Sequence, residues 1–110
     1  MRDIAESDWK LLRQLHQLAL DRFCERVLSE IGQVISASGP SSHQQYLAVF
    51  ELIMRRNSEL AEAFDDLRRS TAILRLASIQ SHHLLSEEEF GRFSKSTRDA
   101  VEALFAIRMT

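Results

Sequence analysis

The residues of this sequence that could bind a metal ion are its carboxylates, its histidines and its lone cysteine. The histidines and the cysteine are His16, Cys24, His43, His82 and His83. No pair has the His-x3-His, Cys-x2-Cys or Glu-x2-His spacing that places two ligands beside each other. His82 and His83 are adjacent, so on a helix their side chains point about 100° apart and cannot easily share one ion. We therefore expect no metal site and no cofactor.

Cys24 is the one candidate nucleophile. Phe23 and Val27 are its neighbours on an apolar half of a helix, where a thiol usually serves as a small buried hydrophobe. Arg22 and Arg26 flank it and could lower the pKa of an exposed thiol, but on a helix both point away from its face. We expect a packed structural cysteine, with a redox-sensitive thiol as the alternative. The sequence contains no Gly-x-Ser-x-Gly turn and no glycine-rich phosphate loop, so we predict that the protein is not an enzyme.

Four polar residues form the one stripe in which we predict a binding site. Thr71, Arg75, Ser78 and His82 are spaced by four, three and four residues, which places them on one face of a helix. That face continues the apolar stripe of Leu60, Phe64 and Leu67. Arg75 stays charged and therefore needs a carboxylate, a carbonyl or an anion within hydrogen-bonding distance. The acids that could pair with it are Glu87 to Glu89, Glu30 and Glu51. The stripe is therefore either structural or a site for a partner or a small anion.

A helix-turn-helix is suggested in outline by the helices on either side of Asn57-Ser58. The second of them would be the recognition helix, yet its first turns carry Glu59, Glu62, Asp65 and Asp66. Four carboxylates there would repel phosphates, so we expect no nucleic-acid binding.

Length and composition describe an ordinary small globular chain. The 110 residues have 45% apolar and 27% charged residues with a net charge of −2, which predicts one domain over residues 1–110 and excludes wholesale disorder. A single cysteine allows no internal disulfide, and nowhere do 18 apolar residues follow one another. The N-terminal residues are polar and lead into no signal core. We expect a cytoplasmic protein without a membrane segment.

Three glycines and one proline leave long stretches of good helix formers, so we predict an all-α fold: a compact bundle of about four helices, the long ones bent or interrupted. The first helix should run from Ser7 to about Ile35, before a loop over residues 36–41. A second should run from Ser42 or His43 to about Arg56, with Tyr46, Leu47, Phe50, Ile53 and Met54 on one face. Asn57-Ser58 should end it, and a third helix should run from Glu59 to about His82. Ser86 to Glu89 is a capping box that opens the last helix, whose stripe is Phe90, Phe93, Thr97, Val101 and Leu104.

Two of these helices change their apolar face part-way. The first helix carries two apolar clusters whose centres lie roughly 150° apart. The first cluster is Leu11, Leu12, Leu15, Leu18 and Ala19, and the second is Phe23, Cys24, Val27, Leu28, Ile31 and Val34. Either the helix bends or breaks near Leu20, or its halves pack against different partners. The third helix shows the same change between Leu60, Ala63, Phe64 and Leu67 and the later Ile73, Leu76 and Ala77. Such surfaces exceed what one small monomer covers, which predicts a homodimer through part of the first or third helix.

The sequence therefore favours a non-catalytic protein–protein interaction module, a small homo-oligomeric helical protein that binds a partner protein through exposed helix faces. The alternative is a small-ligand or regulatory sensor whose anion site is built on Arg75 and His82.

Overall fold

The computed structural model describes residues 4–37, 39 and 41–109, with side chains as far as residue 107. Two residues of the predicted 36–41 loop, Ser38 and Pro40, and the polar N-terminal residues 1–3 lie outside the described residues. The elements in chain order are α1 (Glu6–Ser36), α2 (Ser42–Phe64), a short 3-10 helix η1 (Arg69–Thr71), α3 (Ala72–Ser81), α4 (Glu87–Gly91) and α5 (Lys95–Met109). The described residues contain no strand, and the predicted all-α bundle is confirmed.

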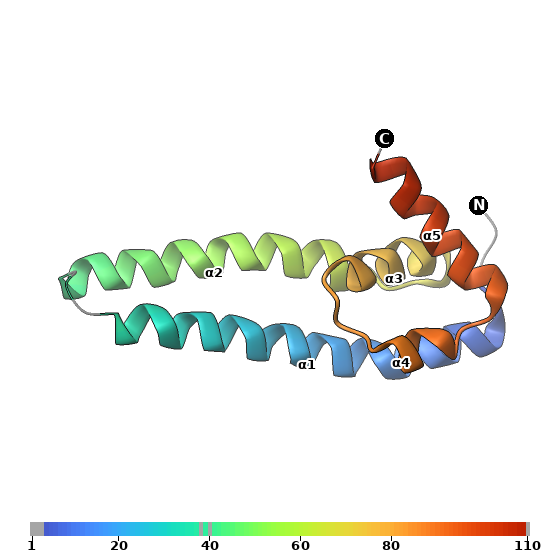
Figure 1. Cartoon of the computed structure of the whole chain (residues 1–110), viewed down its shortest axis with the longest axis horizontal. Coiled ribbons are helices and arrows are strands. Elements are labelled where there is room, and N and C mark those ends of the chain that lie inside the picture. The colour runs from blue at the N-terminus through green and yellow to red at the C-terminus, as the bar shows by residue number, and fades with distance from the viewer. Residues whose placement is uncertain (1–3, 38, 40, 110) are drawn as a thin grey trace.

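The helices form a base and a projecting arm (Figure 1). The arm consists of the C-terminal half of α1 and most of α2, which run antiparallel and meet at the tip near residue 39. The base gathers α3, α4 and α5 around the N-terminal half of α1. The arm makes the molecule elongated, at 52 × 29 × 23 Å, and its radius of gyration is 16.7 Å. A globular domain of this length has a radius of gyration of about 13 Å.

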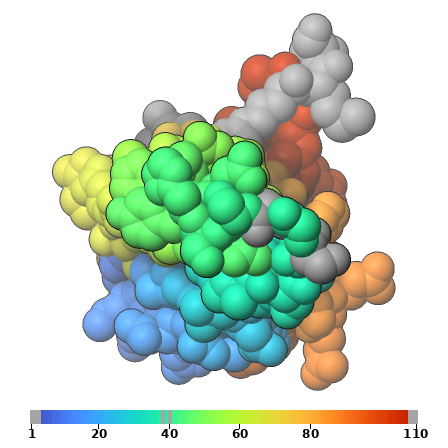
Figure 2. All heavy atoms as spheres, turned by 90° about the vertical axis from the view of Figure 1, so that its left-hand side faces the viewer, coloured from blue at the N-terminus to red at the C-terminus, as the bar shows by residue number. Residues whose placement is uncertain are grey.

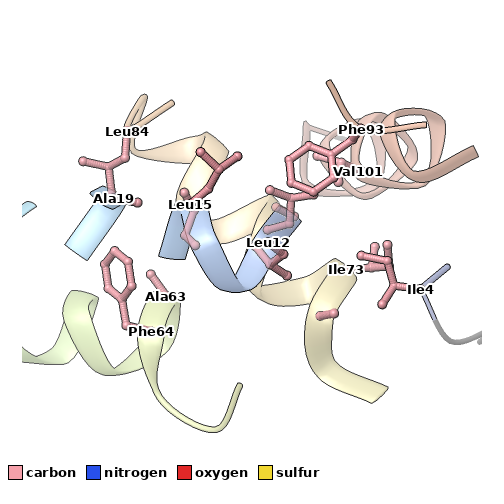
Figure 3. Packing of buried hydrophobic residues seen from close by; sticks show 14 of the residues in the cluster. Ile4, Leu12, Leu15, Ala19, Ala63, Phe64, Ile73, Leu84, Phe93 and Val101 are labelled. Carbon is pink, nitrogen blue, oxygen red and sulfur yellow. The ribbon is translucent and has the colours of Figure 1, made fainter. Parts of the chain in front are cut away.

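Helix α1 is continuous over 31 residues, so the predicted break near Leu20 does not occur. The other alternative holds: its halves pack against different partners. Leu12, Leu15 and Ala19 are buried in the base (Figure 3), whereas Val27 and Ile31 lie along α2 in the arm. A face switch in a sequence therefore marks a change of neighbours, and the helix itself needs no bend.

Helix α2 begins at the capping box of Ser41 and Gln44 and passes straight through Asn57-Ser58 to Phe64. The predicted end at Arg56 is wrong, and with it the outline of a helix-turn-helix. Asn and Ser cost a helix only a few tenths of a kcal/mol relative to better formers. The burial of Leu52, Ala63 and Phe64 along α2 outweighs that cost.

The predicted third helix is interrupted at residues 65–71. Helix α2 ends at Phe64, and Asp65 caps it in an extended conformation. Asp66 follows with a φ of 56°, a left-handed conformation that Asp tolerates better than most residues. Its carbonyl accepts a 2.6 Å hydrogen bond from the Thr71 hydroxyl, which fixes the turn before α3. The interruption lets α3 fold back onto α1, so that Ile73, Leu76 and Ala77 enter the core.

The last predicted helix is likewise two helices. Ser86 caps α4 through the predicted capping box, and α5 starts after Ser94. Residues of the predicted stripe still face the core: Phe93, Thr97 and Val101 are buried. Figure 3 shows Phe93 and Val101 beside Leu12 of α1. Among the described residues, no helix is long and apolar enough to cross a bilayer.

Candidate functional site

The stripe predicted from the sequence lies along α3, but its members contact different neighbours. At the start of α3, Thr71 is held in the turn by Asp66 and accepts a 3.0 Å hydrogen bond from the backbone N–H of Arg68. Arg75 donates from Nε to the carbonyl of Asp65 at 2.6 Å and from Nη1 to that of Glu62 at 3.0 Å. These are carbonyls at the C-terminal end of α2, where a cation is favoured. Arg75 thus ties α3 to α2, through carbonyls instead of the expected acids.

The other two members of the stripe lie toward the far end of α3. Ser78 is buried, and its carbonyl accepts a hydrogen bond from the Ser81 hydroxyl. His82 caps α3, and its ring packs edge-on against Phe23 of α1 with centroids 5.8 Å apart. Thr71 and Arg75 therefore act at one end of the helix, and His82 at the other. The stripe fastens α3 to α2 and α1.

Two arginines of α1 hold the segment between α3 and α4 onto the base. Arg22 forms a bidentate pair with Glu89, at 2.7 and 3.0 Å, and also donates to the carbonyl of Leu84. Hydrogen bonds from the Arg22 guanidinium and then from the backbone N–H of Ser86 lower the pKa of Glu89 to about 2. Arg26 donates to the carbonyls of His82 and His83. Sequence reasoning placed both arginines away from Cys24 but gave no signal for these partners, 56 to 67 residues away.

A buried carboxylate joins the starts of α1 and α5. Asp8 accepts hydrogen bonds from the backbone N–H and hydroxyl of Ser94 and from the hydroxyl of Thr97. Burial opposes ionisation, but the hydrogen bonds from Ser94 and Thr97 outweigh it and hold the pKa of Asp8 below its ordinary 3.8. Because donors of the same chain satisfy this carboxylate, we assign Asp8 a structural role.

The charges inside the arm compensate one another. Arg56 of α2 donates to Glu30 of α1 at 2.8 and 3.0 Å and to Glu59, one turn further along α2, at 2.9 and 3.0 Å. These hydrogen bonds raise the pKa of Arg56 and lower that of Glu30. Among the described residues, no group of three or more histidines, cysteines or acids could hold a metal ion.

Cys24 lies on the wall of an apolar groove between α1 and α2, and it is half-buried rather than packed in the core as expected. The groove has a volume of about 250 Å³. Its walls are lined by Phe23, Cys24, Val27, Leu28, Ile31, Ile53, Arg56, Asn57 and Leu60. One side of the arm is therefore apolar and open.

Exposed apolar side chains continue from this groove over the outside of α2. We call this surface the apolar arm face: Leu28 and Ile35 of α1 with Tyr46, Leu47, Phe50, Ile53 and Met54 of α2. Its α2 members lie on the side of that helix opposite the buried Leu52, because residues at this spacing fall on the opposite side of the wheel. Tyr46, Phe50 and Met54 are 67%, 53% and 54% exposed.

The view onto the tip of the arm shows α2, in green, stacked on α1, in blue to teal, with α5 behind (Figure 2). The face that the sequence predicted for the second helix exists, but it points away from the rest of the chain. The later apolar residues of the predicted third helix, Ile73, Leu76 and Ala77, are in contrast buried in the core, whereas the second apolar half of α1 is only partly covered by α2.

Comparison with known protein families, with curated proteins and with solved structures finds no match to this chain.

Proposed function

We propose that the protein is a non-catalytic protein–protein interaction module that docks through the apolar arm face and acts as a homodimer. The observation that carries this proposal is the position of the face. Five large apolar side chains between Tyr46 and Met54 occupy just over two turns of a helix whose other side already packs on α1. Single exposed apolar residues are ordinary on a protein surface, but a contiguous apolar face is typical of an interaction site.

The composition of the face supports a protein partner. Aromatic residues and methionine are enriched at protein interfaces, and charged residues are depleted from their centres. Tyr46, Phe50 and Met54 supply the first kind, and the face contains no charged residue. The lone thiol of Cys24 beside it is compatible with the proposed cytoplasmic location, where thiols stay reduced.

The anion-sensor alternative has no specific observation in its favour. Arg75 donates hydrogen bonds from Nε and Nη1 to the carbonyls of Asp65 and Glu62. His82 lies at the other end of α3. The Thr71 hydroxyl and these two donors of Arg75 are thus bonded within their own chain.

A pair of matched substitutions tests the proposal. Phe50→Glu places a charge in the apolar arm face, and Leu74→Glu makes the same kind of change at an exposed leucine of α3, outside the arm. Both side chains are exposed, so both variants should melt near the temperature of the unmodified protein. Sedimentation velocity should show that Phe50→Glu alone loses the associated species. Equal association in the two variants, or equal loss in both, would contradict the proposed role of the face.

A further inference from the structure

The exposed side of α2 contains a heptad-like stripe. Tyr46, Phe50, Ile53 and Asn57 are spaced by four, three and four residues, and all four are exposed. This is the alternation of d and a positions through which two helices pack knobs into holes. On a helix whose other side already contacts α1, such a stripe is a second packing surface.

The accessible surface of the molecule exceeds that of an average folded monomer of its mass. Its accessible surface is 7311 Å², whereas a folded monomer of 12.7 kDa exposes about 6,200 Å². The surplus, roughly 1,000 Å², is close to the ~800 Å² that each partner contributes to a protein interface of standard size.

We infer that the occupant of this surface is a second copy of the chain, with α2 packed antiparallel against α2 of the partner. The stripe is its own antiparallel complement. When Phe50 stands opposite the partner's Ile53, the residues four positions outward come level as well, so Tyr46 stands opposite the partner's Asn57. A twofold axis then repeats both pairs, and each large ring faces a smaller side chain, as interdigitating layers require.

The polar atoms of the stripe fix this register. Neither the Tyr46 hydroxyl nor the Asn57 amide forms a hydrogen bond with a residue that the structure describes. In the antiparallel pair, the phenol of each copy meets the amide of the other, so two hydrogen bonds flank an apolar centre of Phe50 and Ile53. An asparagine at a core heptad position selects one register, because any slip leaves its amide buried without a partner.

The stripe has no charged residue, and this argues against nucleic acid or lipid as its occupant. Phosphates of nucleic acid or of lipid headgroups are bound by lysine and arginine, and Tyr46, Phe50, Ile53 and Asn57 include neither. A second copy also supplies the smaller side chain of Ile53 opposite Phe50 and the amide of Asn57 opposite Tyr46.

Cysteine cross-linking tests the register, which rests on the proposed function. In a Cys24→Ala background, one chain carries Tyr46→Cys and a second, longer tagged chain carries Asn57→Cys. Eleven residues of helix separate these positions by about 16 Å, so they cannot bond within one chain. On oxidation, the mixture should give a disulfide-linked dimer of one chain of each kind, and neither variant should cross-link by itself. A mixture of Phe50→Cys and Ile53→Cys chains should also give the mixed dimer.

Each other result has a defined meaning. Cross-linking of Tyr46→Cys with itself would overturn the inference in favour of parallel helices. A mixture that stays uncross-linked although light scattering shows a dimer would overturn the register and leave the proposed function intact. A single-chain mass at all concentrations would overturn both self-association and the inference drawn from it.

Discussion

The carboxylate of Asp8 accepts a 2.7 Å hydrogen bond from the hydroxyl of Thr97, which joins the first turn of α1 to the first turn of α5 across 89 residues. Both residues are buried, and Ser94 completes the set of donors around the same carboxylate. This contact fixes where α5 begins and so closes the core of the base over Leu12.

Asp8→Asn should therefore weaken the base. The amide retains the shape of the carboxylate but has no negative charge and only one acceptor oxygen for the three donors of Ser94 and Thr97. We expect a loss of about 1.5–3 kcal/mol in the free energy of unfolding, typical of hydrogen bonds to a charged group. Urea denaturation followed by circular dichroism measures it. Asp21→Asn, an exposed acid of the same helix, is the control, and an equal effect of both changes would contradict the role of Asp8.

Stability should fall in acid. The folded protein lowers the pKa of Asp8 from 3.8 and that of Glu89 from 4.5 to about 2. A lowered folded pKa stabilises the protein fully above the unfolded pKa, and the contribution disappears as the pH falls through the folded value. The free energy of unfolding should thus be flat near neutral pH and decline between about pH 5 and pH 2. Combining Asp8→Asn with Glu89→Gln should flatten that decline; an unchanged slope would be evidence against both assignments.

Arg75→Met should reduce stability and leave association unchanged. The change removes the hydrogen bonds to the carbonyls of Glu62 and Asp65 and keeps much of the apolar stem. We expect a loss of about 1–3 kcal/mol in the free energy of unfolding. Arg92→Met is the control, since that exposed side chain donates to no residue that the structure describes. Weaker association with full stability would restore the binding interpretation of the stripe.

The thiol of Cys24 should react in the folded protein. It is half-buried on an open groove, so a maleimide should label it without prior unfolding, faster than a core thiol. Cys24→Ala should lower the free energy of unfolding by on the order of 1 kcal/mol or less, because a half-exposed site leaves little cavity. Labelling that occurs only in denaturant would place Cys24 in the core after all.

The sequence predicted where helices occur better than it predicted which elements pack against them. The capping box at Ser86, the start of α1 near Ser7 and the absence of strands follow from residue types and spacing. The break at Asn57-Ser58 was wrong because two mild helix-destabilising residues cannot end a helix that buries Leu52 and Phe64 on either side of them. The observed interruption near Asp66 depends on the left-handed conformation of that residue and on long-range packing. No single residue type predicts either of them.

The candidate site, too, could be predicted from the sequence only in part. The spacing of Tyr46, Leu47, Phe50, Ile53 and Met54 predicted one apolar face, but a periodic pattern does not say whether a face meets the core or solvent. Only the position of α1, on the opposite side of α2, shows that this face is left uncovered. The partners of Arg75 were outside sequence reasoning for a related reason, because backbone carbonyls at a helix end have no signature of their own.

The mass of the unmodified protein in solution tests the central claim most directly. Light scattering coupled to size exclusion, over a series of concentrations up to the high micromolar range, should give twice the 12.7 kDa of the chain. The mass should fall toward that of one chain on dilution or in Phe50→Glu. A mass of 12.7 kDa at every concentration would contradict the claim that the apolar arm face pairs two copies.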